Sequence, residues 1–456
     1  MTLAVFDGTP VGSTRDHATW PDFSDAELIY AGREAGRGPF GANGPVIREA
    51  EEAFAQHFGV AHAVLGPNAT LMLEAAQRVL GVGVGDEVVQ TPYTFPATAH
   101  STQGAGGVPV FGDIRADTLS LDPDTIEITD RTRAIMPVSM HGVIPPDLDA
   151  YRMIAVKHNL PIIYDNAQAA GATFGEANAG NIGDVAVISL NHKKILCADQ
   201  GAILLTGNKA IADAVRQYIQ YGMERLTSAV EIPSYWMPTT GTNLAATNHQ
   251  AALASARLYG LKEDGRNRRG LQDHVKAAQR NMETLNQIIS GLPGLVLPDL
   301  PEGSSPAWQR PRFTLDPEAL GWERSPRELR DRIGAALRAE GLPIRSWQEW
   351  PAQGNAAFRR QVPYVQSSRR PATRPAPYDP VSSPVTVQVL ESGLIMADHP
   401  WAWWAQPERI ITDHYGRAFH KVWEHMEDVM NRDFETPRPR PWPNLTGLPH
   451  YARAGA

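Results

Sequence analysis

The chain has 456 residues, of which 42% are hydrophobic and 20% charged, and its formal net charge is -8. This length leaves room for two domains with a sizeable core, and the composition is that of an ordinary globular protein. The negative charge argues against a general affinity for nucleic acid. The single cysteine, Cys197, excludes an intramolecular disulfide and fits a reducing cytoplasm, where we expect the protein to reside.

Neither a targeting segment nor a membrane span is predicted. The N-terminal "MTLAVFDGTPVGSTRDHATWPDF" has no basic start followed by an apolar core, so it does not read as a signal peptide. No window approaches the length of apolar sequence that a membrane helix needs. We therefore expect small-molecule partners, with no nucleic-acid or membrane partner.

Apolar strands and helices alternate between about residues 60 and 220, after an amphipathic helix over 46–58. The strands are predicted over 61–66, 86–92, 108–114, 133–142, 160–168, 184–191 and 201–207. The intervening helices are predicted over 69–83, 94–106 and 146–159. Because the strands are almost wholly apolar, the sequence predicts an α/β fold in which helices cover both faces of a mostly parallel sheet.

The pattern changes after about residue 265. Helices are predicted over 266–289, 325–344 and 417–431, and residues 360–387, rich in Pro, Ser and Arg, are predicted to form a long exposed loop. We therefore divide the chain into an N-terminal arm (1–45), a large domain (46–265) and a smaller C-terminal α/β domain (266–456).

Residues capable of chemistry follow three of the predicted strands. They are Phe95, Asp165 with Gln168, and Ser189 with Lys193 and Lys194. In a parallel sheet, ligands bind beyond the carboxyl ends of the strands. A lysine, a carboxylate and an aromatic ring at that edge would suit pyridoxal 5'-phosphate (PLP), which needs a Schiff-base partner, a partner for its pyridine nitrogen and a stacking surface.

A helix start could hold the phosphate of that cofactor, because Ala69 and Thr70 would present backbone N–H groups there. Each residue alone has a simpler interpretation. Asp165 alone would be a loop cap, Phe95 a core residue, and the double lysine a solvated turn. The combination, in this order and at strand ends, is what favours the cofactor site.

Four segments carry a resemblance to a known family. They are "VIREAEEAFAQHFGVAHAV", "NATLMLEAAQRVLGVGVGDEVVQTPYTFPATAHSTQGAGGVPVFGDI", "YDNAQAAGA" and "GTNLAATNHQAAL". The sequence resembles the DegT/DnrJ/EryC1/StrS group of sugar and cyclitol aminotransferases from about residue 20 to 265, with a weaker continuation to the end. The resemblance implies PLP fold type I, with a seven-stranded sheet and a smaller C-terminal domain. It also implies a homodimer with shared active sites.

The resemblance distinguishes the two lysines. In the family a serine lies five residues before the Schiff-base lysine, and a Glu-Gly-Gly begins six residues after it. Counting from Ser189 and from Gln200 gives Lys194 both times, which makes Lys193 a neighbour.

Further roles carry over by position. The resemblance implies that Asp165 pairs with the pyridinium nitrogen, that Gln168 lies near the ring hydroxyl, and that Phe95 stacks on the ring. It implies a phosphate site made by Ala69, Thr70 and Ser189, and by Asn243 of the other subunit. No metal site is predicted.

Some positions depart from the family pattern and suggest a divergent branch. Asn68-Ala69 replaces Ser-Gly, Tyr164 replaces a Glu, Gln200-Gly201-Ala202 replaces Glu-Gly-Gly, and Ala245 stands where an arginine is frequent. The implied activity is transfer of an amino group from an amino acid, glutamate or glutamine, to a keto or aldehyde group. The acceptor is a sugar, cyclitol or related precursor in antibiotic biosynthesis.

Three alternatives stay open. One is another PLP enzyme on this fold, such as a lyase, a racemase or a dehydratase; family dehydratases carry histidine at the lysine position, against which Lys194 argues. A second is a PLP-binding protein without turnover, and a third, ranked last, is an NAD-type α/β enzyme. For "DHPWAWW" at 398–404, packing is favoured over substrate contact.

Overall fold

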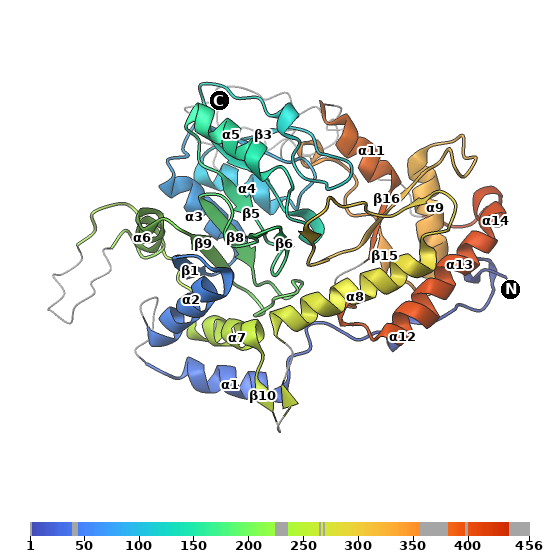
Figure 1. Ribbon diagram of the computed structural model, residues 1–456, viewed down its shortest axis with the longest axis horizontal. Coiled ribbons are helices and arrows are strands. Elements are labelled where there is room, and N and C mark those ends of the chain that lie inside the picture. Colours follow the sequence, from blue (N-terminus) through green and yellow to red (C-terminus); the bar gives the residue numbers. More distant parts are fainter. Residues whose placement is uncertain are drawn as a thin grey trace, which may run out of the picture.

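The computed structural model describes residues 2–38, 44–223, 236–263, 266–267, 270–355, 382–396 and 400–436. Figure 1 shows a part built on a twisted sheet and, beside it, a part formed by the C-terminal third of the chain, with the long helix α8 running between them. The helices of the first part are α1 Asp25–Ala35, α2 Pro45–Phe58, α3 Ala69–Val79, α4 Ala97–Ala105, α5 Leu148–His158, α6 Lys209–Tyr218 and α7 Asn248–Tyr259. Those of the second part are α8 Leu271–Ile289, α9 Pro326–Ala339, α11 Pro384–Ser392, α12 Glu408–Ile410, α13 Arg417–Glu424 and α14 Met426–Asn431.

The central sheet is mostly parallel, as predicted. Its strands are β1 His62–Gly66, β2 Glu87–Gln90, β3 Val108–Phe111, β4 Thr132–Met136, β5 Ile163–Asp165, β8 Val185–Ser189 and β9 Ala202–Thr206. They form two groups, β3-β2-β4 and β1-β9-β8-β5. Parallel bridges between Ile135 and Ile162 and between Val138 and Asp165 connect β4 to β5. Since β9 is antiparallel to both β8 and β1, β1 runs in the same direction as β8, and its carboxyl end lies at the same edge.

Helices cover both faces of this sheet because successive strand residues point to opposite sides. In β8, Val185 and Val187 pack into one cluster with the buried face of α3 and with α6. Ala186 and Ile188 pack into a second cluster with α2, α7 and α8. Both faces are therefore buried, which explains why the strands read as continuous apolar runs.

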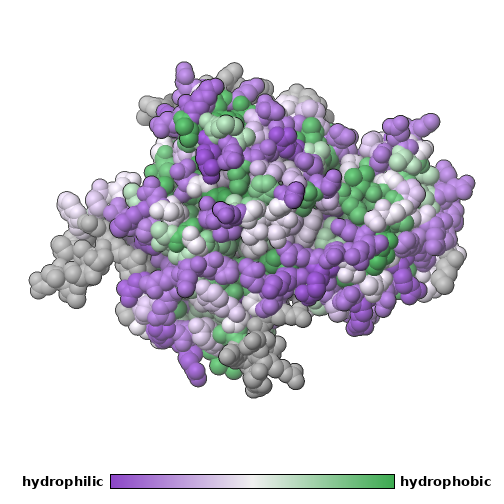
Figure 2. All heavy atoms as spheres, viewed as in Figure 1, coloured by the Kyte–Doolittle hydropathy of each residue, from purple (hydrophilic) through white to green (hydrophobic). Residues whose placement is uncertain are grey.

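The second part contains an antiparallel sheet in the order β12-β14-β16-β15. Its strands are β12 Leu295–Val296, β14 Arg312–Leu315, β15 Ile344–Arg345 and β16 Gly393–Met396. A small three-stranded sheet has the order β13-β6-β7, with β6 Thr173–Phe174, β7 Ala177–Asn178 and β13 Ser304–Ser305. A separate pair is formed by β10 Lys262–Glu263 and β11 Arg266–Asn267. Figure 2 shows a hydrophilic band along the outward face of α8. The opposite face of α8 buries residues such as Val275, Met282 and Leu285.

The N-terminal arm lies against the C-terminal part before it reaches the central sheet. The short helix η1 Ala4–Phe6 packs on α9, and Figure 1 places the N-terminus beside α13 and α14. The buried Glu340 carboxylate accepts the backbone N–H groups of Ala4 (2.8 Å) and Val11 (2.9 Å) and pairs with Lys421 (2.9 Å). Further along, the Gln406 amide pairs with both backbone groups of Ala18.

Most of the helices and strands predicted in chain order are present, but some details differ. Residues 417–431 form two helices, α13 and α14, because the chain departs from helical geometry at His425. The predicted exposed loop at 360–387 is wrong at its end, since residues 384–387 begin α11 and Thr386 is fully buried. Residues 360–381 lie outside the described part of the chain. Among the described residues, no helix combines the length and apolar character needed to cross a membrane.

Candidate active site

A cavity of about 1010 Å³ lies at the carboxyl ends of the central strands. The predicted site residues that line it are Ala69, Thr70, Phe95, Asp165, Gln168, Ser189, Lys193 and Lys194. They come from the start of α3, the segment after β2, and the ends of β5 and β8. The parallel sheet therefore brings together residues that lie up to 125 positions apart.

Asp165 is a buried carboxylate at the end of β5, with 5% of its surface exposed. One oxygen accepts a hydrogen bond from the Thr98 hydroxyl (2.7 Å), and the other accepts one from the Ala167 backbone N–H (3.1 Å). Burial raises the pKa of Asp165, although these two hydrogen bonds and the charge of Lys194 act in the opposite direction. The surroundings therefore compensate the negative charge of the ionised carboxylate only in part.

Lys194 lies in the irregular turn that joins β8 to β9 and is partly buried on the cavity wall. Its backbone N–H donates to Asn191 O (2.8 Å), which tightens the turn. Lys193 is exposed, although it also borders the cavity. Ser189, at the end of β8, is buried, and its hydroxyl accepts the Asn191 N–H (3.3 Å).

The start of α3 faces the cavity through Asn68, Ala69 and Thr70. The Asn68 side chain caps the helix by accepting the Leu71 N–H (3.0 Å), which fixes where the helix begins. Early N–H groups of a helix have no partner within the helix, and the dipole is positive there. This end of the cavity can therefore hold an anion such as a phosphate.

Phe95 presents an apolar ring to the cavity with 59% of the residue exposed, so it is not the core residue that it would be if read alone. It lies two residues before the start of α4, whose Thr98 supports Asp165. An exposed aromatic ring in a polar cavity offers a stacking surface for a flat ligand.

Sequence reasoning missed Arg310, a buried arginine that also lines the cavity. Its guanidinium donates to the side-chain Oε1 of Gln168 (2.7 Å) and lies over the Trp347 ring at 4.3 Å. Arg310 is separated from Gln168 by 142 positions and stands in a segment that carries no recognisable motif. In the sequence, Arg310 is a charged residue beside an apolar strand, and this pattern does not identify its hydrogen-bond partner.

Behind Gln168 lies a second buried pair that the sequence did not indicate. Tyr93 and His141 share a hydrogen bond of 3.0 Å between the phenol oxygen and Nε2. Burial and the charges of Arg310 and Arg312 lower the pKa of His141 well below its usual value. His141 is therefore neutral, and it accepts or donates hydrogen bonds without adding a charge.

The outer wall of the cavity comes from residues 345–355 of the second part, which sequence reasoning also missed. Its members on the cavity are Arg345, Trp347, Gln348, Glu349, Trp350 and Asn355. The Gln348 amide donates to Thr94 O, next to Phe95. Arg327 holds Glu349 through its carboxylate (3.2 Å) and its carbonyl (2.9 Å). This wall is thus attached both to the central sheet and to α9.

Asn243 is not brought to this cavity. It is exposed and forms an isolated antiparallel bridge with Gln220. Trp403 and Trp404 are fully buried, which confirms packing for these two residues of "DHPWAWW". His399 of that segment lies outside the described residues.

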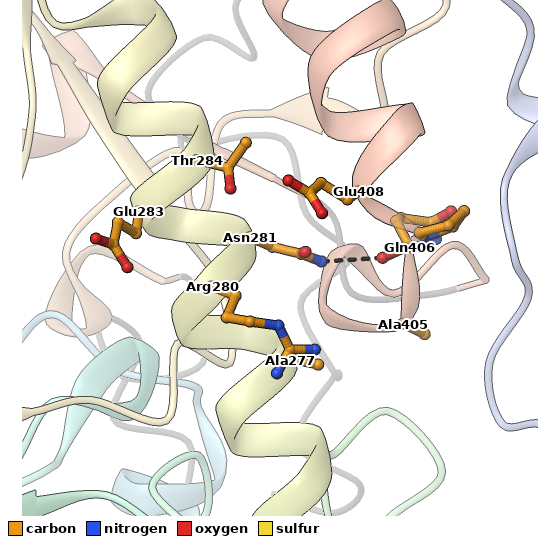
Figure 3. A pocket seen from close by; sticks show the side chains of 9 residues that line it. Ala277, Arg280, Asn281, Glu283, Thr284, Ala405, Gln406 and Glu408 are labelled. Atoms are coloured by element: carbon orange, nitrogen blue, oxygen red, sulfur yellow. Dashed lines mark hydrogen bonds between the residues drawn. The ribbon is translucent and has the colours of Figure 1, made fainter.

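A second cavity of about 410 Å³ lies between α8 and the segment 405–408. Figure 3 shows Asn281 pointing from α8 toward Gln406, to whose carbonyl it donates (3.1 Å), with Arg280 and Glu408 at the rim. It contains no lysine or aromatic ring. Within the described ranges, no group of three or more His, Cys, Asp or Glu side chains is placed to hold a metal ion.

Comparisons with known proteins identify a family for this chain. Residues 24–391 match the model of the DegT/DnrJ/EryC1/StrS aminotransferase family. The chain is 37% identical to a GDP-perosamine synthase of Caulobacter vibrioides over 222 residues, which cover 48% of this chain and 58% of that protein. It is 34% identical to an L-glutamine:2-deoxy-scyllo-inosose aminotransferase of Streptoalloteichus tenebrarius over 300 residues, which cover 63% of this chain and 68% of that protein.

Solved structures share the fold. An aminotransferase from Psychrobacter cryohalolentis superposes with a TM-score of 0.73 at 26% identity, covering 90% of this chain and 100% of that one. The predicted PLP fold type I is thereby confirmed. The family match extends over the central sheet, the cavity residues and most of the second part. This protein therefore belongs to the DegT/DnrJ/EryC1/StrS aminotransferase family.

Proposed function

We propose that this protein is a PLP-dependent aminotransferase that transfers an amino group from an amino acid to a keto or aldehyde group of a sugar or cyclitol. The observation that carries the proposal is the convergence of Lys194 and Asp165 on one cavity in a member of an aminotransferase family. By their names, one relative is a synthase of GDP-perosamine and the other is an aminotransferase of L-glutamine and 2-deoxy-scyllo-inosose, and both names support this class of acceptor.

The residues of the cavity fit PLP. Burial raises the pKa of Asp165, because its negative charge is only partly compensated. A protonated pyridine nitrogen would supply the missing compensating charge. The start of α3 would receive the phosphate at Ala69 and Thr70, with Ser189 as a further donor. Phe95 would cover one face of the ring, and Gln168 would lie beside its hydroxyl.

When bound, PLP supplies an electron sink that stabilises the negative charge left by removal of a proton from the donor's α-carbon. In the proposed mechanism Lys194 would hold the cofactor through its amine, and the free amine of the same residue would take the proton from the donor's α-carbon as general base and return a proton as general acid. Asp165 would favour the protonated pyridine nitrogen through its negative charge. Trp347 and Trp350 line the outer wall, where they would limit the access of water to the reacting carbon.

The proposed donor is glutamine or glutamate. Support for glutamine comes from the name of the Streptoalloteichus relative. For the acceptor of this chain we propose the class of ketosugars and ketocyclitols. Lys194 supports amino transfer over dehydration, because a lysine provides the amine that holds the cofactor.

We further propose that the enzyme works as a homodimer. Asn243 is exposed, and the exposed apolar residues Tyr221, Trp236 and Met237 are near it in the sequence. Such a surface suits burial against a second copy. In that arrangement Asn243 would reach the phosphate of the other subunit's site.

The test is an absorption spectrum of the purified protein with PLP, before and after L-glutamine or L-glutamate. Wild type and Lys193→Ala are expected to show a visible band that the donor bleaches, and Lys194→Ala is expected to lose it. A band that survives in Lys194→Ala but is lost in Lys193→Ala would contradict the lysine assignment. A band that neither donor affects would favour another PLP reaction, or another amino donor, over the one proposed.

A further inference from the structure

Three consecutive residues around Lys194 are held by side chains from two distant parts of the chain. The Lys193 carbonyl, the Lys194 carbonyl and the Ile195 N–H each form a hydrogen bond with a side chain. Such irregular backbone needs partners for its polar groups when it is buried. The identity of those partners decides how firmly the lysine is held.

Gln309 provides two of the three contacts. Its Nε2 donates to the Lys193 carbonyl (2.7 Å), and its Oε1 accepts the Ile195 N–H (2.9 Å). Only one orientation of the amide satisfies both bonds, since the flipped amide would place two donors, and two acceptors, against each other. Gln309 therefore holds the backbone on both sides of Lys194.

Trp20 of the N-terminal arm provides the third contact. Its indole N–H donates to the Lys194 carbonyl (3.1 Å). The residue is 2% exposed, and the Arg257 guanidinium lies 5.1 Å from its ring. Arg257 in turn pairs with Glu27 (2.9 Å), so the indole sits among buried and paired groups.

Both supports are themselves immobilised. Gln309 has no exposed surface, and the neighbouring Ala307 donates its N–H to Gly142 O (2.9 Å). A Cβ at Gly142 would lie 3.0 Å from the backbone nitrogen of Gln309, which shows how closely the two segments pack. Trp20 donates its own backbone N–H to Pro400 O (2.8 Å).

We infer that Gln309 and Trp20 are positioning residues that fix the Lys194 backbone, and through it the Lys194 amine, relative to Asp165. The inference rests on the proposed function, because it assigns these residues to the orientation of the proposed catalytic lysine. Neither side chain lines the cavity, so neither is placed to touch the substrate. Because proton transfer depends steeply on distance and angle, a displacement of about 1 Å in the lysine would slow the reaction by about 100-fold.

The test uses the variants Trp20→Phe, which removes the indole N–H and keeps an aromatic ring, and Gln309→Met, which keeps the length and removes both polar groups. The matched controls are Trp423→Phe and Gln77→Met. The Trp423 indole donates to Pro293 O (2.8 Å), and Gln77 is a fully buried amide that bonds to Leu73 O (3.1 Å). Neither control residue touches the Lys194 turn or the cavity.

Each PLP-reconstituted protein is mixed with L-glutamine, and three quantities are measured: the bleaching rate at saturating donor, the apparent donor Kd, and the pH midpoint of the visible band. Trp20→Phe and Gln309→Met are expected to slow bleaching at least tenfold and to shift the midpoint, with the donor Kd changed less than threefold. The controls are expected to lower the melting temperature comparably and to leave the rate and midpoint as in wild type.

Hydrogen exchange of the cofactor-free proteins gives a readout that needs no reaction. The Ile195 amide is expected to exchange at least tenfold faster in Gln309→Met than in wild type, with β9 unchanged. Wild-type rates and midpoints in both variants, or fast exchange at Ile195 in wild type, would overturn the positioning role and leave the proposed function standing. A wild type without a PLP band, or a Lys194→Ala variant that keeps it, would remove the proposed function and the positioning role together.

Discussion

The Thr98 hydroxyl donates a hydrogen bond of 2.7 Å to the Asp165 carboxylate, and it hydrogen-bonds to the Thr94 hydroxyl at the same distance. Since Thr98 donates to Asp165, the Thr94 hydroxyl must be the donor in the second bond. A chain of two hydroxyls thus leads from the segment after β2 to the carboxylate at the end of β5. Burial raises the pKa of Asp165, and the hydrogen bond from Thr98 opposes this effect only in part.

Asp165→Asn is expected to stabilise the cofactor-free protein at neutral pH. Burial raises the folded-state pKa of Asp165 above its unfolded value, so between the two values the folded state holds more protons. Stability therefore falls as the pH rises through that window, and above it wild type bears the cost of an ionised buried carboxylate. In thermal unfolding from pH 4 to 8, the melting temperature of the variant should rise relative to that of wild type as the pH increases.

The same variant should be catalytically impaired. Removal of the charge that we propose to face the pyridine nitrogen is expected to slow donor-dependent bleaching by about 100-fold or more, the scale of losing one preorganised electrostatic contact. Thr98→Val is the matched control, because it keeps the carboxylate and removes one hydrogen bond. An Asp165→Asn protein that reacts at the wild-type rate would contradict the role of the carboxylate.

Phe95→Ala is expected to weaken cofactor binding with little effect on folding. The residue is 59% exposed, so the free energy of unfolding of the cofactor-free protein should change by no more than about 0.5 kcal/mol. Loss of a stacking contact of about 0.5 to 1.5 kcal/mol should raise the PLP Kd by up to about tenfold. For contrast, Phe54→Ala removes a fully buried ring and should cost about 3 to 5 kcal/mol in stability. An unchanged PLP Kd would argue against stacking.

The buried pair His17 and His414 should make the protein sensitive to acid. His414 Nε2 donates to the Glu340 carbonyl (3.0 Å), so its Nδ1 accepts from His17 Nε2 (3.1 Å), and both rings are neutral. Burial and the neighbouring His414 lower the pKa of His17 to about 4. The unfolded chain takes up the proton near pH 6.5, so stability present above that pH is lost as the pH falls toward 4.

His17→Gln should flatten the acid limb of the stability curve, by an amount on the order of 3 kcal/mol between pH 7 and pH 4. Urea unfolding at several pH values measures this difference. The exposed His158 provides the control, and His158→Gln should leave the curve as in wild type. A His17→Gln curve parallel to the wild-type curve would show that the pair does not titrate in this range.

Arg310→Met tests the contact that orients Gln168. Loss of a charge-assisted hydrogen bond, worth about 1.5 kcal/mol, should slow donor-dependent bleaching about tenfold. Loss of the positive charge should also raise the pKa of His141, which NMR of the imidazole can follow. Arg310→Lys keeps the charge without the planar guanidinium, and it should restore the His141 titration more fully than the rate. Bleaching at the wild-type rate in both variants would show that Gln168 needs no such support.

Local sequence patterns predicted the buried strands and the edge of the sheet at which the cavity lies. The apolar runs over 61–66, 184–191 and 201–207 fell on β1, β8 and β9, because a strand buried on both faces leaves no polar alternation. The residues after β5 and β8 could be placed at one cavity, because parallel strands end at a common edge. The choice of Lys194 over Lys193 came from the family spacing and stays a prediction.

What escaped prediction depends on contacts between distant segments. Trp20 meets the Lys194 carbonyl across 174 positions, and Gln309 meets Ile195 across 114. Trp20-Pro21 matches a short pattern of the family branch that acts on cyclitols, but this pattern does not indicate a contact with Lys194. Gln309 stands in no motif, and the sequence does not distinguish a buried glutamine from a surface one. The division of the chain into three parts also stays a prediction. The N-terminal arm contacts the last helices, and β13 pairs with β6 across the boundary proposed near residue 265.

The arm that carries Trp20 also constrains the order in which the site can assemble during translation. The Lys194 turn leaves the ribosome before one of its supports, Gln309, which is translated more than a hundred residues later. Trp20 is translated before the turn, yet its arm is held by Glu340, Gln406 and Lys421, which follow the turn by more than a hundred residues. A nascent chain can therefore form the central sheet well before it can hold the lysine in place, and a competent site forms only after Lys421 has been made.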